Sequence, residues 1–204
     1  MKKVSLIIIA GASALMMQAC NHRPKVPDPV KEADSTNAAN DTPRGDTDKR
    51  IQAEVNDDDD ARFVVKAASG GMSEVELGKL AVKKAHSANV RAFGEMMVAD
   101  HSKANKQLTA LADSDRISLP QYPGKKEEKL SDDLIKKTGN DFDMAYVDAM
   151  VKDHQEDIKD FEKEIKNAKG ADIKAFAQNT LPVLQKHLKA ITAIQDSMKH
   201  NTQK

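Results

Sequence analysis

The sequence predicts an all-α protein whose folded part is a four-helix bundle made of two helical hairpins. Four stretches after residue 60 place apolar residues three and four positions apart, and none shows the alternating pattern of a strand. The connections inside the first and the last pair of helices are short, whereas a longer one joins the two pairs. We expect a signal peptide over 1–19, a lipidated Cys20 with a disordered linker over 20–56, and the helical domain over 57–200.

The start of the chain has the plan of a bacterial lipoprotein signal. Lys2 and Lys3 give a short positive segment, and the apolar run from Val4 to Met17 is shorter than the ~20 residues of a membrane-spanning helix. Cys20 follows a small residue and resembles the lipidated cysteine of a lipobox; a generic secretory signal is the alternative. Because Cys20 is the only cysteine, the remaining chain has no internal disulfide and no thiolate metal site.

Lipidation of Cys20 predicts a membrane anchor, since two or three acyl chains hold a protein at a bilayer effectively permanently. Asn21 stands where some inner-membrane lipoproteins carry Asp. We therefore expect an outer-membrane lipoprotein facing the periplasm, with the inner membrane as the alternative. A nucleic-acid partner is not expected, because 32 basic residues balance 32 acidic ones and aromatic residues are scarce. A protein partner remains open.

Residues 21–56 are predicted to form a disordered tether. Pro, Asp, Asn, Thr and Lys dominate this segment, and its apolar residues are too few to form a core. The acidic run 57–60 follows it. We interpret this run as the start of a helix, where negative charge complements the helix dipole; weak cation binding is the alternative.

The helices themselves are predicted from their apolar stripes. Four long helices are expected over residues 61–86, 89–114, 141–168 and 172–199, with a short helix around 127–137 between the two pairs. Gly70 and Gly71 interrupt the first helix and favour a bend, and Pro182 favours a kink in the fourth. A weak repeat supports a duplicated hairpin, since residues 89–94 match residues 172–177.

Three histidines lie on the apolar stripes, each near the middle of its own helix: His101, His154 and His187. The first helix offers two carboxylates, Glu74 and Glu76, of which Glu76 is expected to share a face with the apolar residues around it. Neutral imidazoles that converge with one carboxylate suit a divalent transition metal such as Zn, Fe, Mn or Cu. The alternative is a set of core histidines that neighbouring carboxylates satisfy without a metal.

Two aspartates directly precede histidines. Asp100 and Asp153 cannot point in the same direction as the histidine that follows each of them, because consecutive helical residues face different ways. They could accept hydrogen bonds behind the ligands or pair with lysines. The methionines at helical spacing are interpreted as core filler and not as a copper site.

Several segments, in order along the chain, are similar to domain-of-unknown-function family 4142: Glu74–Ala81, Phe93–His101, Leu119-Pro120, Asp141–Tyr146, Met150–His154 and Phe176–Leu188. The resemblance covers about residues 60–192. It implies a ferritin-like four-helix bundle in an exported or outer-membrane bacterial protein, and it implies no known reaction. Dinuclear iron proteins of that fold carry Glu-X-X-His on two helices, but here Val98, Val151 and Leu184 stand three residues before the histidines. Ferroxidase chemistry is therefore not expected.

No catalytic set is found, because the chain has no nucleophile motif and no glycine-rich phosphate loop. The first hypothesis is a non-enzymatic envelope domain that binds a partner or helps the cell tolerate stress. The second is a metal-binding bundle that uses the histidines with Glu74 or Glu76. The third is a hydrolase with a single metal ion and Glu156 as its base. An enzyme is the less favoured class.

Overall fold

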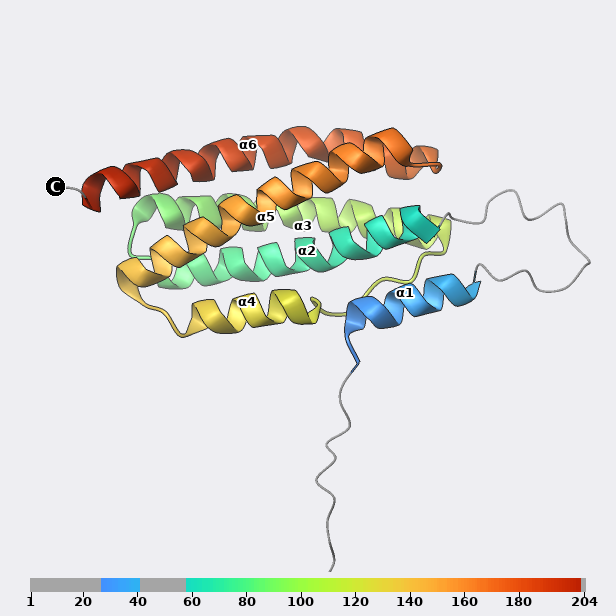
Figure 1. The fold of residues 1–204 in the computed structure, drawn as a ribbon, viewed down its shortest axis with the longest axis horizontal. Coiled ribbons are helices and arrows are strands. Elements are labelled where there is room, and N and C mark those ends of the chain that lie inside the picture. The colour runs from blue at the N-terminus through green and yellow to red at the C-terminus, as the bar shows by residue number, and fades with distance from the viewer. Residues whose placement is uncertain (1–26, 41–57, 203–204) are drawn as a thin grey trace, which may run out of the picture.

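The computed structural model describes residues 27–40 and 58–202, so the predicted signal peptide, Cys20 and much of the predicted linker lie outside the described residues. The described part is all-helical and contains no strand. Its six helices are α1 (Pro29–Asn40), α2 (Asp58–Lys84), α3 (Ala88–Asp115), α4 (Lys125–Ile135), α5 (Gly139–Asn167) and α6 (Ala171–Thr202) (Figure 1). Among these residues no helix combines the length and the apolar character needed to cross a membrane.

The four long helices lie along the long axis of the molecule, and α1 and α4 follow one another along the side of α2 (Figure 1). The closest pairs are α2 with α3 and α5 with α6, as expected of two helical hairpins. In addition α3 packs against α6 and α2 against α5, so each long helix has two long neighbours. The four predicted long helices and the short one between them are confirmed, with bounds shifted by a few residues.

The turn of each hairpin is held by an aspartate from the other hairpin. Asp60, in the first turn of α2, accepts hydrogen bonds from the backbone N–H groups of Lys169 and Gly170, at 3.0 and 2.7 Å, between α5 and α6. Asp143, near the start of α5, accepts from the backbone N–H groups of His86 and Ser87, at 3.0 and 2.6 Å, between α2 and α3. These reciprocal contacts fit a duplicated hairpin and fix how the two hairpins dock.

The prediction of disorder was wrong for residues 29–40, which form α1. Asp28 accepts a hydrogen bond from the backbone N–H of Val30 at 3.1 Å and so caps the helix. Asn37 donates to the Ser118 carbonyl at 3.1 Å and accepts from the Ser118 N–H at 2.7 Å. Ala33 is buried in the core. This segment has too few apolar residues to fold alone, and its order comes from tertiary contacts with the helices beside it.

The predicted interruption at Gly70 and Gly71 is not found, because α2 is one continuous helix. Gly71 faces the side chain of Asn105, whose Oδ1 atom would lie 2.1 Å from a Cβ at this position. Further along, α2 and α3 approach so closely that a Cβ at Gly78 would lie 2.8 Å from the Gly94 carbonyl oxygen. Helix α6 continues through Pro182.

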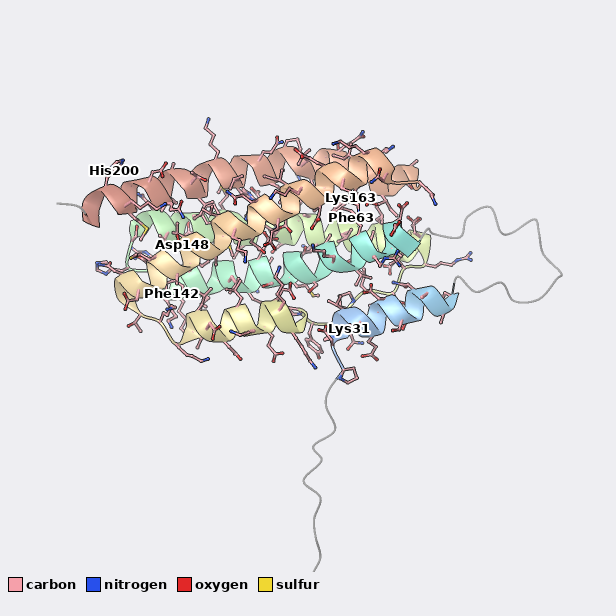
Figure 2. All side chains as sticks on the ribbon, viewed as in Figure 1. Lys31, Phe63, Phe142, Asp148, Lys163 and His200 are labelled. Atoms are coloured by element: carbon pink, nitrogen blue, oxygen red, sulfur yellow. The ribbon has the colours of Figure 1, made fainter. Side chains whose placement is uncertain are left out.

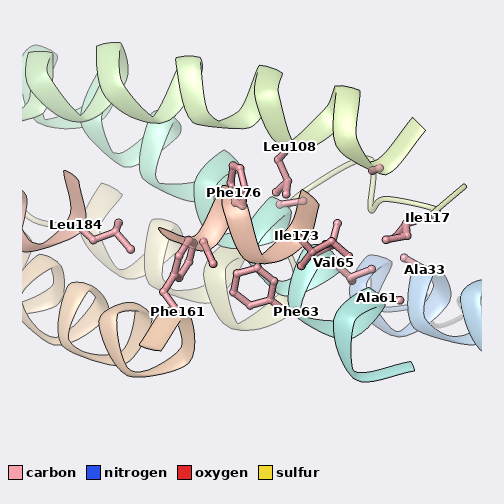
Figure 3. Close-up of a cluster of buried hydrophobic side chains, with 14 residues drawn as sticks. Ala33, Ala61, Phe63, Val65, Leu108, Ile117, Phe161, Ile173, Phe176 and Leu184 are labelled. Atoms are coloured by element: carbon pink, nitrogen blue, oxygen red, sulfur yellow. The ribbon is translucent and has the colours of Figure 1, made fainter. Parts of the chain in front are cut away.

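The core consists of two apolar clusters, one toward each end of the long helices. The first cluster contains side chains such as Phe63, Phe161 and Phe176 (Figure 3). The rings of Phe63 and Phe161 pack edge to face, with their centroids 4.9 Å apart. The second is built around Leu77, Phe142, Tyr146 and further buried residues. Exposed charged side chains cover the outside, as Figure 2 shows for Lys31, Asp148 and Lys163. Between the clusters, each long helix contributes a buried polar side chain.

Candidate metal centre

Four buried polar side chains lie between the two apolar clusters, one from each long helix: Glu74, His101, His154 and His187. Their exposed fractions are 2%, 5%, 0% and 0%. Each is flanked along its own helix by a residue of each cluster; His154, for example, lies between Met150 of the second cluster and Phe161 of the first. The helical register that buries the apolar stripes therefore also brings these four groups together.

The three imidazoles meet through one nitrogen atom each. His101 Nε2 lies 3.3 Å from His187 Nδ1, and His154 Nε2 lies 3.4 Å from the same atom. Glu74 completes the group, because its Oε1 atom lies 3.6 Å from His154 Nε2. Four ligands placed tetrahedrally at ~2.0–2.1 Å from a zinc ion stand roughly 3.3–3.4 Å from one another. The two distances at His187 Nδ1 match that spacing, and Glu74 Oε1 lies slightly farther from His154 Nε2.

The outward nitrogen of each histidine has a hydrogen-bond acceptor. His154 Nδ1 lies 3.0 Å from the Met150 carbonyl oxygen, which can only accept, so this nitrogen carries the proton. His187 Nε2 lies 2.9 Å from Asp100 Oδ2. His101 Nδ1 lies 2.7 Å from Glu74 Oε2. When Glu74 is ionised, all three outward nitrogens donate, and the three inward nitrogens face one another as bare lone pairs.

Such facing lone pairs repel one another unless something positive lies between them. A proton on one inward nitrogen relieves the contact for one pair only, whereas a metal ion accepts all three lone pairs at once. The outward hydrogen bonds fix the tautomer and ring orientation that a metal ligand requires. Asp100 takes one of the two roles expected for it, since it lies behind a histidine of another helix as a hydrogen-bond acceptor.

Burial keeps the histidines neutral. Removal from water lowers the pKa of His101 to about 4, and removal from water together with the neighbouring imidazoles lowers the pKa of His154 to about 3. Burial also lowers the pKa of His187, although the hydrogen bond to Asp100 opposes it. Neutral imidazole is the form that binds a metal. Burial raises the pKa of Glu74 well above its ordinary value, so an ion bound here displaces a proton from this carboxyl group.

The predicted site residues divide into two groups. Glu74 and the three histidines lie together, whereas Glu76 is exposed and lies outside the group, because residues two apart on a helix face different directions. Glu156, considered as a base, forms an ion pair with Lys126 at 3.0 Å on the surface. It lies outside the group as well.

One acidic residue beside this centre, Asp157, was not among the predicted site residues. Asp157 lies with Glu74 and Asp153 in a second group, in which one carboxylate oxygen of each residue lies within 4.8 Å of the others. A signal for it was present in the sequence, since Asp157 follows Asp153 by four residues and so shares a helix face with it. Glu74 is the member that contacts the histidine group.

These features define a class: an all-helical protein with a buried group of histidine and carboxylate side chains that could hold a metal ion. The chain belongs to the family described as Domain of unknown function (DUF4142), whose model matches residues 45–194. The resemblance predicted from the sequence is thereby confirmed. The comparison with curated proteins gives no match.

A solved structure described as "CopM in the Cu(II)-bound form" is similar to this chain. The TM-score is 0.55 and the sequence identity 12%, over 68% of this chain and 96% of that one. An identity this low shows a shared helical fold alone.

Proposed function

We propose that this protein holds a divalent transition-metal ion at the centre of a ferritin-like four-helix bundle, as a non-enzymatic metal-binding domain. The observation that carries the proposal is the convergence of three imidazole nitrogens, 3.3 and 3.4 Å apart, whose outward nitrogens all face acceptors. The proposal takes up the second of the hypotheses formed from the sequence. A partner-binding role remains compatible with it.

The ligand chemistry narrows the choice of metal. Three imidazoles and one carboxylate suit Zn²⁺ and Cu²⁺, which stand at the high-affinity end of the divalent series. The two printed distances between imidazole nitrogens match the ligand spacing around a zinc ion and favour Zn²⁺, and likeness in fold to a protein solved with Cu(II) makes Cu²⁺ the natural second candidate. With thiolates absent from the group, the soft ion Cu⁺ is disfavoured.

The location proposed for this domain is the cell envelope. The lipobox-like segment that ends at Cys20 supports export and lipidation, and Asn21 supports the outer membrane facing the periplasm. Residues between the anchor and the bundle then set the distance of the metal centre from the lipid surface. Labelling with a radioactive or alkyne fatty acid, lost on Cys20→Ser, tests the anchor.

Metal binding is tested by equilibrium dialysis of the full chain against Zn²⁺ and Cu²⁺ after chelation, with bound metal counted by elemental mass spectrometry. All samples carry Cys20→Ser, which removes the one thiol. The test variant replaces His101, His154 and His187 by Ala, and the control replaces the exposed His86 and His200. We expect close to one ion per chain in the parent and the control, and none retained by the test variant.

A second variant guards against misfolding of the triple substitution. Glu74→Gln keeps the size of the side chain but removes the charge that compensates the metal, so affinity falls while the helical circular dichroism signal remains. Equal metal retention by the parent and the triple variant would overturn the proposal. So would a parent that binds neither ion.

A further inference from the structure

The candidate metal centre is closed differently on its two sides along the helices. On the side of the second apolar cluster, each of the four candidate ligands has a fully buried apolar residue about one helical turn away on its own helix. These residues are Leu77, Met97, Met150 and Ile191, all 0% exposed. Together they form a closed apolar layer across the bundle, which keeps water from the histidines on this side.

On the side of the first cluster the corresponding layer is incomplete. About one turn from the candidate ligands stand Gly70 of α2, Asn105 of α3 and Asp157 of α5, which are small or polar and partly exposed. Helix α6 alone places an apolar residue there, Leu184, which is 2% exposed. The centre therefore comes closest to solvent between the helices on this side.

A cavity of about 30 Å³ lies at this position, and residues of all four long helices line it. Of the four candidate ligands, Glu74 and His101 line the cavity, whereas His154 and His187 do not. The space holds roughly two water molecules. A zinc ion contacts oxygen at ~2.0–2.2 Å, closer than the ~2.7 Å of a hydrogen bond between hydroxyl groups, so a space that admits water also admits the ion.

The side chain of Asn105 forms a movable part of the cavity wall. Its Oδ1 atom lies so close to Gly71 that a Cβ at this glycine would be 2.1 Å away, and both residues line the cavity. The amide of Asn105 thus reaches from α3 across to α2. Because Asn105 is partly exposed, rotation of its side chain turns the amide into solvent and widens the cavity without moving a helix.

We propose that this cavity is the passage through which the metal ion enters and leaves the centre, with Asn105 as its movable side. The inference rests on the proposed function, since it concerns the ion held there. An ion that arrives through the cavity meets Glu74 and His101 first, and His154 and His187 then complete its coordination. A buried metal site needs such an entry path, and the closed layer on the other side leaves this one.

The test is the rate of Zn²⁺ uptake and release by the full chain carrying Cys20→Ser, measured by stopped flow with a chromogenic chelator. Ala104→Leu enlarges a side chain of the cavity wall, and Asn105→Ala removes the movable amide. The control is Ala145→Leu on α5, which is partly exposed as Ala104 is but lies outside the cavity. We expect Ala104→Leu to slow uptake and release alike by roughly tenfold, and Asn105→Ala to speed both. Affinity should stay unchanged, because a passage alters the barrier and not the bound state.

The outcomes separate this inference from the proposed function. Uptake and release rates equal to those of the control in both variants would overturn the passage, even where the ion binds at the histidines. Faster exchange in Ala104→Leu would overturn it too, because the ion would then cross by a general loosening of the fold. A changed affinity with an unchanged uptake rate would have the same meaning. A parent that binds neither Zn²⁺ nor Cu²⁺ would overturn the metal centre, and the passage with it.

Discussion

Glu164, near the end of α5, should make the stability of the fold depend on pH. Its side chain is 7% exposed, and one of its oxygens lacks a hydrogen-bond partner in the described part of the chain. Burial, together with the charge of neighbouring Asp60, raises the pKa of Glu164 from 4.5 to about 7. The folded protein therefore keeps a proton that the unfolded chain releases. The stabilisation is fully present below pH 4.5 and is lost as the pH rises through 7.

The magnitude follows from the size of the rise in pKa. At ~1.4 kcal/mol per pH unit, a pKa raised from 4.5 to about 7 corresponds to about 3 kcal/mol of stability lost between pH 4.5 and pH 8. Urea unfolding of the parent and of Glu164→Gln at several pH values isolates this contribution, because Gln has no proton to lose. The parent should lose about 3 kcal/mol more than the variant over this range. Parallel pH profiles would refute the reasoning.

Three further predictions concern packing, the metal ligands and α1. Gly94→Ala should destabilise the fold by about 1–3 kcal/mol, because its Cβ would lie 2.7 Å from a backbone carbonyl oxygen of α2. Gly70→Ala, with open space around it, should be neutral or stabilising by up to ~1 kcal/mol. Thermal unfolding compares the two variants, and equal effects would contradict the close approach of α2 and α3. Asp100→Ala should weaken metal affinity about 10–100-fold without loss of helix, because it removes the hydrogen-bond acceptor behind His187. A chelator competition measures this affinity, and an unchanged affinity would contradict the role of Asp100. Asn37→Ala should speed hydrogen exchange in residues 29–40 but not in α3, because two hydrogen bonds that dock α1 are lost; unchanged exchange means other contacts suffice.

The long helices could be predicted because each carries a continuous apolar stripe that has to be buried. The three histidines were found by the same pattern, since they lie on the stripes in positions where an apolar residue is expected. Their convergence could not be predicted from spacing within one helix. It depends on the axial register of the four helices, which the reciprocal contacts of Asp60 and Asp143 help to fix.

The errors have identifiable causes. Glu76 was expected to share a face with the apolar residues around it, with Glu74 as the other candidate, but only the three-dimensional register of the helices distinguishes the carboxylate that faces the histidines, Glu74, from the exposed one. Helix α1 was missed because its order comes from Asn37 and Ala33, which contact distant parts of the chain. Local composition carries no information about such contacts.

The most direct test of the central claim is the electron paramagnetic resonance spectrum of the full chain, carrying Cys20→Ser, loaded with one equivalent of Cu²⁺. Three imidazole nitrogens converge in the structure, so the copper signal should show coupling to three nitrogen nuclei. Replacing His187 by Ala should reduce the coupling to two nitrogens. A copper signal with no coupling to histidine nitrogens, or one that is the same in the variant, would contradict a metal centre at this position.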